Sequence, residues 1–137
     1  MVSRRDALKL GLVAGGLAAG AAPLAWSARP LRVRDHTVIA KPARLELLGP
    51  DYPSTEVWAF NNMIPGPVLR AVQGDTIRVR FRNRLPMVST IHWHGIRLPN
   101  AMDGVPGITQ PPVKPGEDFQ YEFALPDAGT FWYHPHV

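Results

Sequence analysis

The sequence predicts an all-β domain, built as a sandwich or a barrel, and three observations lead to this prediction. Short segments rich in β-branched and aromatic residues recur along the chain after residue 28. Turn signals such as Pro65-Gly66-Pro67 and Asp127-Ala128-Gly129 separate these segments. No window of about ten residues after residue 28 holds a convincing helical period. Many short strands with frequent turns are typical of sandwiches and barrels.

The first segment, residues 1–28, has the order of an export signal: basic residues, an apolar run, then small residues. The pair Arg4-Arg5 favours the twin-arginine (Tat) route, although Ala7 stands where such signals usually carry a bulky apolar residue. The run at 10–25 is too short and glycine-rich for a stable membrane span, and cleavage is expected within 21–28. A membrane anchor or amphipathic helix is the alternative. The protein is therefore expected in the periplasm or outside the cell.

Composition limits the classes of protein and of site that the chain can form. Residues 29–137 suffice for one domain with a modest core. The formal charge of +4 falls to +2 when the signal's three basic residues and one acidic residue are removed, which gives little support for a nucleic-acid partner. The chain has no cysteine, and this excludes disulfides, zinc-thiolate sites and a copper-thiolate centre.

Seven segments are expected to be strands, in chain order 33–40, 43–48, 55–60, 76–83, 89–94, 119–125 and 130–136. The clearest is 77–84, where apolar residues alternate with arginines. We interpret it as a half-buried strand with a solvated face rather than a nucleic-acid stripe, because alternation alone explains the pattern. The long Pro- and Gly-rich segment 95–116 is expected to line a site, since loops of this length are usually functional or disordered.

Four of the five histidines form two short pairs, His92-Trp93-His94 and His134-Pro135-His136. Residues two apart on a strand share a face, so each pair presents two imidazoles about 6.6 Å apart along one side of a sheet. Imidazole is a ligand for copper, zinc, iron and nickel. The pairs therefore predict half of a multinuclear metal site, and this geometry alone does not identify the metal. His36 lies outside both pairs and is expected to be an ordinary strand histidine.

The residues next to the pairs are expected to support them. Trp93, Trp132 and Tyr133 are interpreted as core residues that stiffen the two strands, in preference to a direct redox role. Pro135 lacks an amide donor, which predicts that its strand lies at an edge or ends nearby.

Several motifs carry a resemblance to a known family. They are Phe60-Asn61-Asn62-Met63-Ile64-Pro65-Gly66-Pro67, Gln73-Gly74-Asp75, Thr90-Ile91-His92-Trp93-His94-Gly95-Ile96, Met102-Asp103-Gly104-Val105-Pro106, Thr109-Gln110-Pro111-Pro112 and Phe131-Trp132-Tyr133-His134-Pro135-His136. In this order the segment resembles the first domain of multicopper oxidases, the laccase-like family that includes periplasmic copper-resistance oxidases. The resemblance implies a cupredoxin-like Greek-key β-sandwich.

The resemblance also implies roles for individual residues. His92 would bind the type 2 copper, His94 and His134 one type 3 copper, and His136 the other. Dioxygen would be reduced to water at this trinuclear cluster by four electrons from one-electron donors such as phenols or metal ions. Asp103 matches an acid that assists proton delivery, although an Asp before Gly is also common in turns. Gln110 would line the same loop.

The chain also departs from the family pattern. The family's cluster lies between two cupredoxin domains and needs about twice as many histidines, and its type 1 copper needs a cysteine. We therefore expect residues 29–137 to be the first cupredoxin domain of a larger exported oxidase, without its last strand or strands, and not competent alone. A small exported copper-binding or copper-delivery protein is the main alternative. A copper-free cupredoxin scaffold and a zinc hydrolase are more remote.

Overall fold

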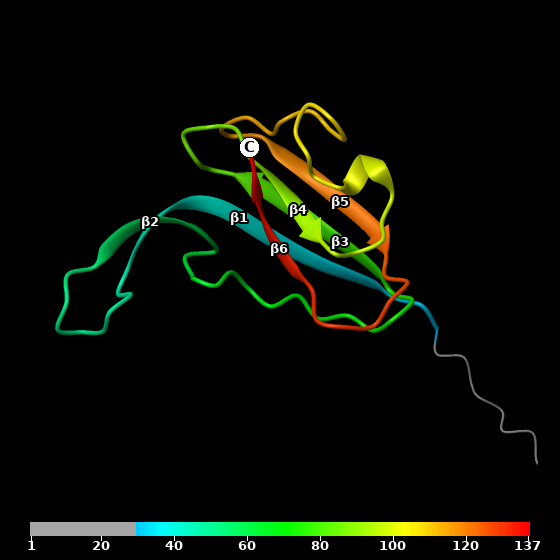
Figure 1. The fold of residues 1–137 in the computed structure, drawn as a ribbon, viewed down its shortest axis with the longest axis horizontal. Coiled ribbons are helices and arrows are strands. Elements are labelled where there is room, and N and C mark those ends of the chain that lie inside the picture. Colours follow the sequence, from blue (N-terminus) through cyan, green and yellow to red (C-terminus); the bar gives the residue numbers. More distant parts are fainter. Residues whose placement is uncertain (1–29) are drawn as a thin grey trace, which may run out of the picture. The chain divides into compact units, whose positions relative to one another are not determined.

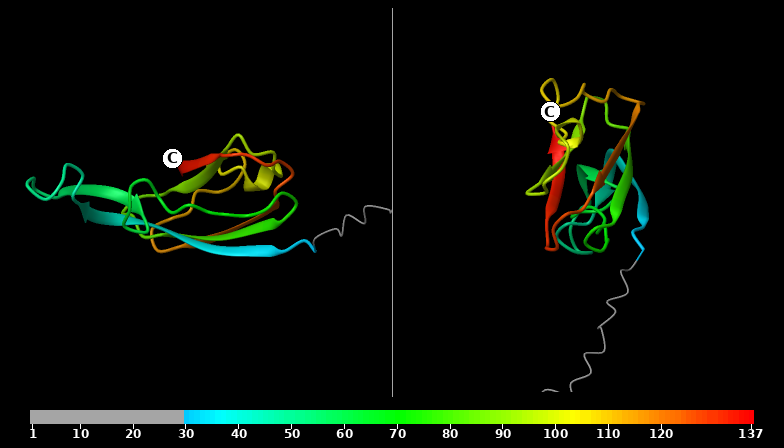
Figure 2. Two further views of the ribbon diagram at one scale, coloured as in Figure 1. Left: turned by 90° about the horizontal axis from the view of Figure 1, so that it is seen from below. Right: turned by 90° about the vertical axis from the view of Figure 1, so that its right-hand side faces the viewer.

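The structure, a computed structural model, describes residues 30–137, and the expected export signal lies outside the described residues. This part of the chain forms two sheets that face each other as layers (Figures 1 and 2). Five strands and a short 3-10 helix precede the last strand; their bounds are β1 Val33–Leu45, β2 Thr55–Phe60, β3 Thr76–Asn83, β4 Thr90–His94, η1 Asn100–Met102, β5 Asp118–Ala124 and β6 Trp132–His136. The larger sheet has the order β2-β1-β3-β5, and β4 pairs with β6 in the smaller one. The predicted all-β, cupredoxin-like sandwich is confirmed.

The longest strand, β1, has two partners along its length. Residues 33–40 pair with β3 in parallel, and residues 40–45 pair with β2 in antiparallel fashion. The prediction of two strands, 33–40 and 43–48, is therefore wrong: one strand runs through Pro42 and ends at Leu45. Pro42 is tolerated because it follows the last residue that pairs with β3, so that side of the strand needs no amide donor from it. Beyond this point the β1–β2 hairpin projects past the other strands (Figure 1).

The apolar residues and arginines that alternate along β3 lie on opposite faces of the sheet, as predicted. Ile77, Val79 and Phe81 are buried in the core, and the arginines lie on the opposite face. On that face Arg78 Nε lies 2.8 Å from a Glu122 carboxylate oxygen on β5. The hydrogen bond from Arg78 lowers the pKa of Glu122. The arginine face is thus partly neutralised by acidic neighbours, which fits a solvated sheet face.

The core lies between the two sheets and packs them against each other. Its buried members come from both layers and include Val38, Ala40, Ile77, Val79, Phe81, Ile91, Trp93, Tyr121 and Phe123. Complete burial of a Val or Phe side chain stabilises a fold by roughly 1.5–3 kcal/mol. Because Ile91 and Trp93 alternate with the histidines of β4, burial of one face of β4 directs the other face away from the core.

Asn83, at the end of β3, connects the core to the start of the histidine strand. Its side-chain amide donates to the Met87 carbonyl at 2.8 Å and to the Val113 carbonyl at 2.9 Å. Val113 in turn forms an isolated bridge with Ser89, directly before β4. A buried amide therefore holds both the entry to β4 and the far end of the long 95–116 loop. No helix among residues 30–137 has the length and apolar character that a bilayer span requires.

Candidate metal centre

The pairing of β4 with β6 places the four histidines on one face. In the antiparallel register His92 lies opposite His134, His94 opposite Trp132, and Thr90 opposite His136. Directly opposed residues of an antiparallel pair have their side chains on the same face of the sheet. The two predicted His-x-His pairs are therefore brought together by strand pairing, with their side chains alternating with the buried Ile91 and Trp93.

Three of the imidazoles converge. One ring nitrogen from each of His92, His94 and His134 lies within 4.8 Å of the others, a group that could hold a metal ion. The centroids of the His92 and His134 rings are 5.2 Å apart, and those of His94 and His134 are 5.9 Å apart. All three donors are imidazoles, a set that suits copper as well as zinc, iron or nickel.

His136 lies at the margin of this group. Its ring centroid is 6.2 Å from those of both His92 and His134. Its Nδ1 atom is buried and has no hydrogen-bond partner among residues 30–137. A buried polar atom without a partner is costly, and coordination to a metal ion would satisfy it. His136 is therefore a candidate metal ligand next to the three-histidine group.

Asp103, the candidate proton-delivery acid, lies beside His92. The main-chain oxygen of Asp103 is 2.7 Å from His92 Nδ1, and its carboxylate oxygen is 3.4 Å from the same atom. When Nδ1–H donates to this carbonyl, Nε2 of His92 is left free to bind a metal. Asp103 therefore orients the ring through its backbone, a contribution that the sequence alone does not reveal.

The loop that carries Asp103 is seated directly on β4. The Thr90 hydroxyl hydrogen bonds to the Gly104 carbonyl and lies 3.1 Å from the His136 carbonyl. Gly104 has a φ of +82°, and a Cβ atom there would overlap the Ile91 carbonyl. Glycine is required at this position both for its backbone conformation and for the close approach to β4.

Comparison with known proteins gives the family. The family model described as multicopper oxidase matches residues 45–137. The chain belongs to the multicopper oxidase family.

Individual relatives agree. The chain is 46% identical over 101 residues to a multicopper oxidase from Mycobacterium tuberculosis, an alignment that covers 74% of this chain and 19% of the relative. It is 50% identical over 78 residues to copper resistance protein A from Pseudomonas syringae, covering 57% of this chain and 13% of the relative. The chain thus spans about a fifth or less of these curated relatives.

Solved structures are similar as well. The crystal structure of a multicopper oxidase from Pseudomonas parafulva matches with a TM-score of 0.70 and 58% identity, over 76% of this chain and 25% of that one. Lac15 from a marine microbial metagenome matches with a TM-score of 0.73 and 48% identity, over 75% of this chain and 28% of that one.

Two of the three aromatic residues expected to support the multicopper oxidase histidines do so from the core side. Trp93 is 2% exposed and packs edge-on against Tyr121 and Phe123. The half-buried Tyr133 donates a 2.8 Å hydrogen bond from its hydroxyl to the Pro67 carbonyl. Burial raises the pKa of Tyr133 to about 12. These contacts hold β4 and β6 against the larger sheet and the 61–72 segment.

Trp132 does not follow the prediction. It is 56% exposed rather than buried, and its ring contacts the rings of His94 and His134. The reason is parity: residue 132 is two before His134, so its side chain projects from the histidine face and not from the core face.

Tyr121 is a supporting residue that sequence reasoning missed. Its fully buried hydroxyl accepts a 2.9 Å hydrogen bond from the Ile91 amide, directly before His92. Burial raises the pKa of Tyr121 to about 12, and hydrogen bonds from Ile91 and from the Gln110 side chain oppose that rise. Gln110 is itself buried, and its side chain also donates to the Pro111 carbonyl at 3.3 Å. In the sequence Tyr121 was only one aromatic residue of a strand, with no signal that its hydroxyl meets β4.

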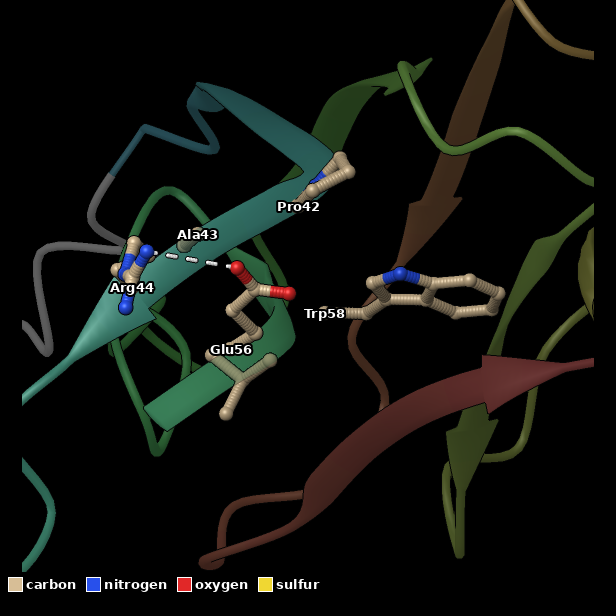
Figure 3. A pocket seen from close by; sticks show the side chains of 6 residues that line it. Pro42, Ala43, Arg44, Glu56 and Trp58 are labelled. Carbon is tan, nitrogen blue, oxygen red and sulfur yellow. Dashed lines mark ion pairs between the residues drawn. The ribbon is translucent and has the colours of Figure 1, made fainter. Parts of the chain in front are cut away.

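Two further features, His36 and a surface hollow, lie outside the group of candidate ligands. His36 is a half-buried residue of β1 and is not a member of the three-histidine group. A hollow of about 690 Å³ lies on the β1–β2 hairpin, lined by Pro42, Ala43, Arg44, Glu56, Val57 and Trp58 (Figure 3). None of its lining residues is a histidine, so this hollow is separate from the candidate metal ligands.

Proposed function

We propose that this protein is an exported multicopper oxidase in which His92, His94, His134 and His136 supply half of the ligands of a trinuclear copper cluster. The cluster would reduce dioxygen to water while one-electron donors are oxidised. The observation that carries the proposal is the β4–β6 register, which opposes His92 to His134 and gathers three donor nitrogens within 4.8 Å. Membership of the multicopper oxidase family supports copper as the metal.

The four ligands are assigned to three copper ions. We assign His92 to the type 2 copper, His94 and His134 to one type 3 copper, and His136 to the other. The marginal position of His136, with its ring centroid 6.2 Å from that of His134, supports its assignment to a separate ion. The remaining ligands and the type 1 copper would come from other cupredoxin domains, since the relatives are several times longer than the matched segment.

When bound, copper would supply the one-electron redox chemistry. The chain's own residues would bind the copper ions and orient the histidine ligands. The Asp103 carbonyl fixes the tautomer of His92, and the Tyr121 hydroxyl holds the Ile91 amide that precedes it. The Asp103 carboxylate is 31% exposed and 3.4 Å from His92 Nδ1, so it is open to solvent and next to a proposed ligand. We assign it the transfer of protons from water toward the cluster.

The proposal also covers the electron-donating substrate and the cellular location of the protein. The candidate one-electron donors are phenols, metal ions such as Cu(I) and other one-electron donors, and the relatives include proteins named laccase and copper resistance protein. The Arg4-Arg5 pair favours export through the twin-arginine route to the periplasm or the outside.

The test replaces single histidines in the protein at its full natural length. His94→Ala and His134→Ala should each lower the copper content and abolish dioxygen consumption with a phenol or Cu(I), because each removes a ligand of the cluster. Copper per protein molecule and oxygen uptake are the measurements, and His36→Ala is the matched control. Full copper loading with retained oxygen uptake in both variants would contradict the proposal. Copper binding by the unaltered protein without oxygen uptake would favour a copper-delivery function.

A further inference from the structure

Trp132 contacts two of the candidate ligands at once. Its ring is stacked on that of His94 across the β4–β6 pair, with centroids 4.6 Å apart and an interplanar angle of 27°. Its ring centroid is also 4.4 Å from that of His134 on its own strand, at an angle of 31°. One indole therefore touches the two imidazoles that are proposed to share a copper ion.

Different groups orient the individual histidines of the candidate site. His92 is held by the Asp103 carbonyl at 2.7 Å. His134 Nδ1 lies 2.9 Å from the carbonyl of its own neighbour, Pro135. Within residues 30–137 the His94 ring has ring contacts but no hydrogen-bond partner, and it is exposed. Trp132 is thus the largest group that limits the orientation of His94.

We propose that Trp132 is a positioning residue, which holds the imidazoles of His94 and His134 in the orientation that binds copper. This inference rests on the proposed copper site. An imidazole that coordinates a metal ion carries more positive charge than a free one, and the face of an indole attracts positive charge within about 6 Å of its centroid. The stack should therefore be stronger in the metal-bound state, so Trp132 should raise copper affinity more than it raises the stability of the apo fold.

The chain offers a matched control for this residue. Trp58 is 54% exposed and Trp132 is 56% exposed, and both lie on two-stranded pairs. Trp58 lies on the hairpin opposite Pro42 and has no histidine among the other residues of its hollow. Replacement of Trp58 removes an equally exposed indole without removing a contact to a candidate ligand.

The experiment compares Trp132→Leu, Trp132→Phe and Trp58→Leu in the full-length protein. Copper affinity is measured by titration of the apo protein in competition with a chelator, and the apo melting temperature is measured separately. Trp132→Leu should weaken copper binding about 10-fold, the lower end of the range for residues that orient metal ligands. Trp132→Phe keeps an aromatic face and should restore part of the affinity. Trp58→Leu should bind copper as the unaltered protein does, and all apo melting temperatures should agree closely.

The outcomes separate this inference from the proposed function. If the unaltered protein binds no copper, or His94→Ala leaves binding intact, the proposed function fails. If the unaltered protein binds copper and both Trp132 variants bind it equally well, only the role of Trp132 is overturned. Loss of the apo fold in both variants would also overturn it, because the indole would then be a structural residue. If only Trp132→Leu loses the apo fold, Trp132→Phe decides by its affinity.

Discussion

The histidine face of β4 and β6 and the projecting half of the β1–β2 hairpin are both two-stranded antiparallel pairs with an exposed tryptophan. The hairpin has the hollow of about 690 Å³ and an exposed ion pair, Arg44–Glu56, at 3.5 Å. The histidine face instead has three convergent donor nitrogens and a buried nitrogen on His136 that has no hydrogen-bond partner among residues 30–137. The candidate donor atoms lie where a packed core supports the strands, and the hollow lies on the projecting hairpin.

The two strand pairs differ in what packs against them from the core side. β4 is held from the core side by Trp93, which is 2% exposed, and by the Tyr121 hydroxyl. The part of β1 that pairs only with β2 runs from residue 41 to residue 45. A site that must hold several ligands in fixed orientations needs side chains locked by packing and by surrounding hydrogen bonds, and only the histidine face has both.

The largest expected effect comes from the tryptophans that lie on the two pairs. Trp93→Ala should lower the free energy of unfolding by about 3–5 kcal/mol, because it leaves a cavity between the sheets. Trp58→Ala should lower it by about 0.5 kcal/mol or less, since this side chain is 54% exposed. Urea unfolding of the two variants measures the difference. Equal losses would mean that the hairpin is packed as firmly as β4.

Two glycines sharpen the comparison at the level of the backbone. Gly104→Ala should cost about 2–4 kcal/mol and displace the Asp103 carbonyl from His92, because its Cβ would overlap the Ile91 carbonyl. At Gly49, which has φ +99° and follows β1, no atom of residues 30–137 lies within 4 Å of such a Cβ. Gly49→Ala should therefore cost about 1 kcal/mol, from backbone conformation alone. Thermal unfolding of both variants, with the copper affinity of Gly104→Ala, tests this difference; similar costs would contradict it.

Alkaline pH should act mainly on the histidine side. Burial raises the pKa of Tyr121 from 10 to about 12, so the unfolded chain loses this proton at a lower pH than the folded chain does. The stability tied to Tyr121 is therefore fully present below pH 10 and is lost as the pH rises toward 12, by at most about 2–3 kcal/mol.

A variant without the Tyr121 hydroxyl tests this pH effect. Tyr121→Phe should make the decline in unfolding free energy between pH 10 and 12 less steep than in the unaltered protein. Urea unfolding across this pH range gives both slopes. A slope that Tyr121→Phe does not change would show that the hydroxyl ionises as freely in the folded chain as in the unfolded one.

Local patterns in the sequence were sufficient for much of this description. Alternation and turn signals predicted most of the strands to within two residues, and the i, i+2 spacing placed each histidine pair on one face, because both depend on the period of a strand. The motif order around His92, Asp103 and His134 predicted the family. The division of β1 into two strands was wrong because Pro42 interrupts the local pattern, while the pairing that permits Pro42 is not local.

Tertiary structure alone decided how the two pairs meet. The register that opposes His92 to His134 joins segments separated by the whole 95–131 stretch, and no local period encodes it. Strand parity places Trp132 on the histidine face, and the register then brings it into contact with His94 on the neighbouring strand. The close approach of the Gly104 backbone to the Ile91 carbonyl brings the Asp103 carbonyl, and not only its side chain, to His92. Residue types and strand period are written along the chain, whereas register and backbone contacts arise only when the core packs.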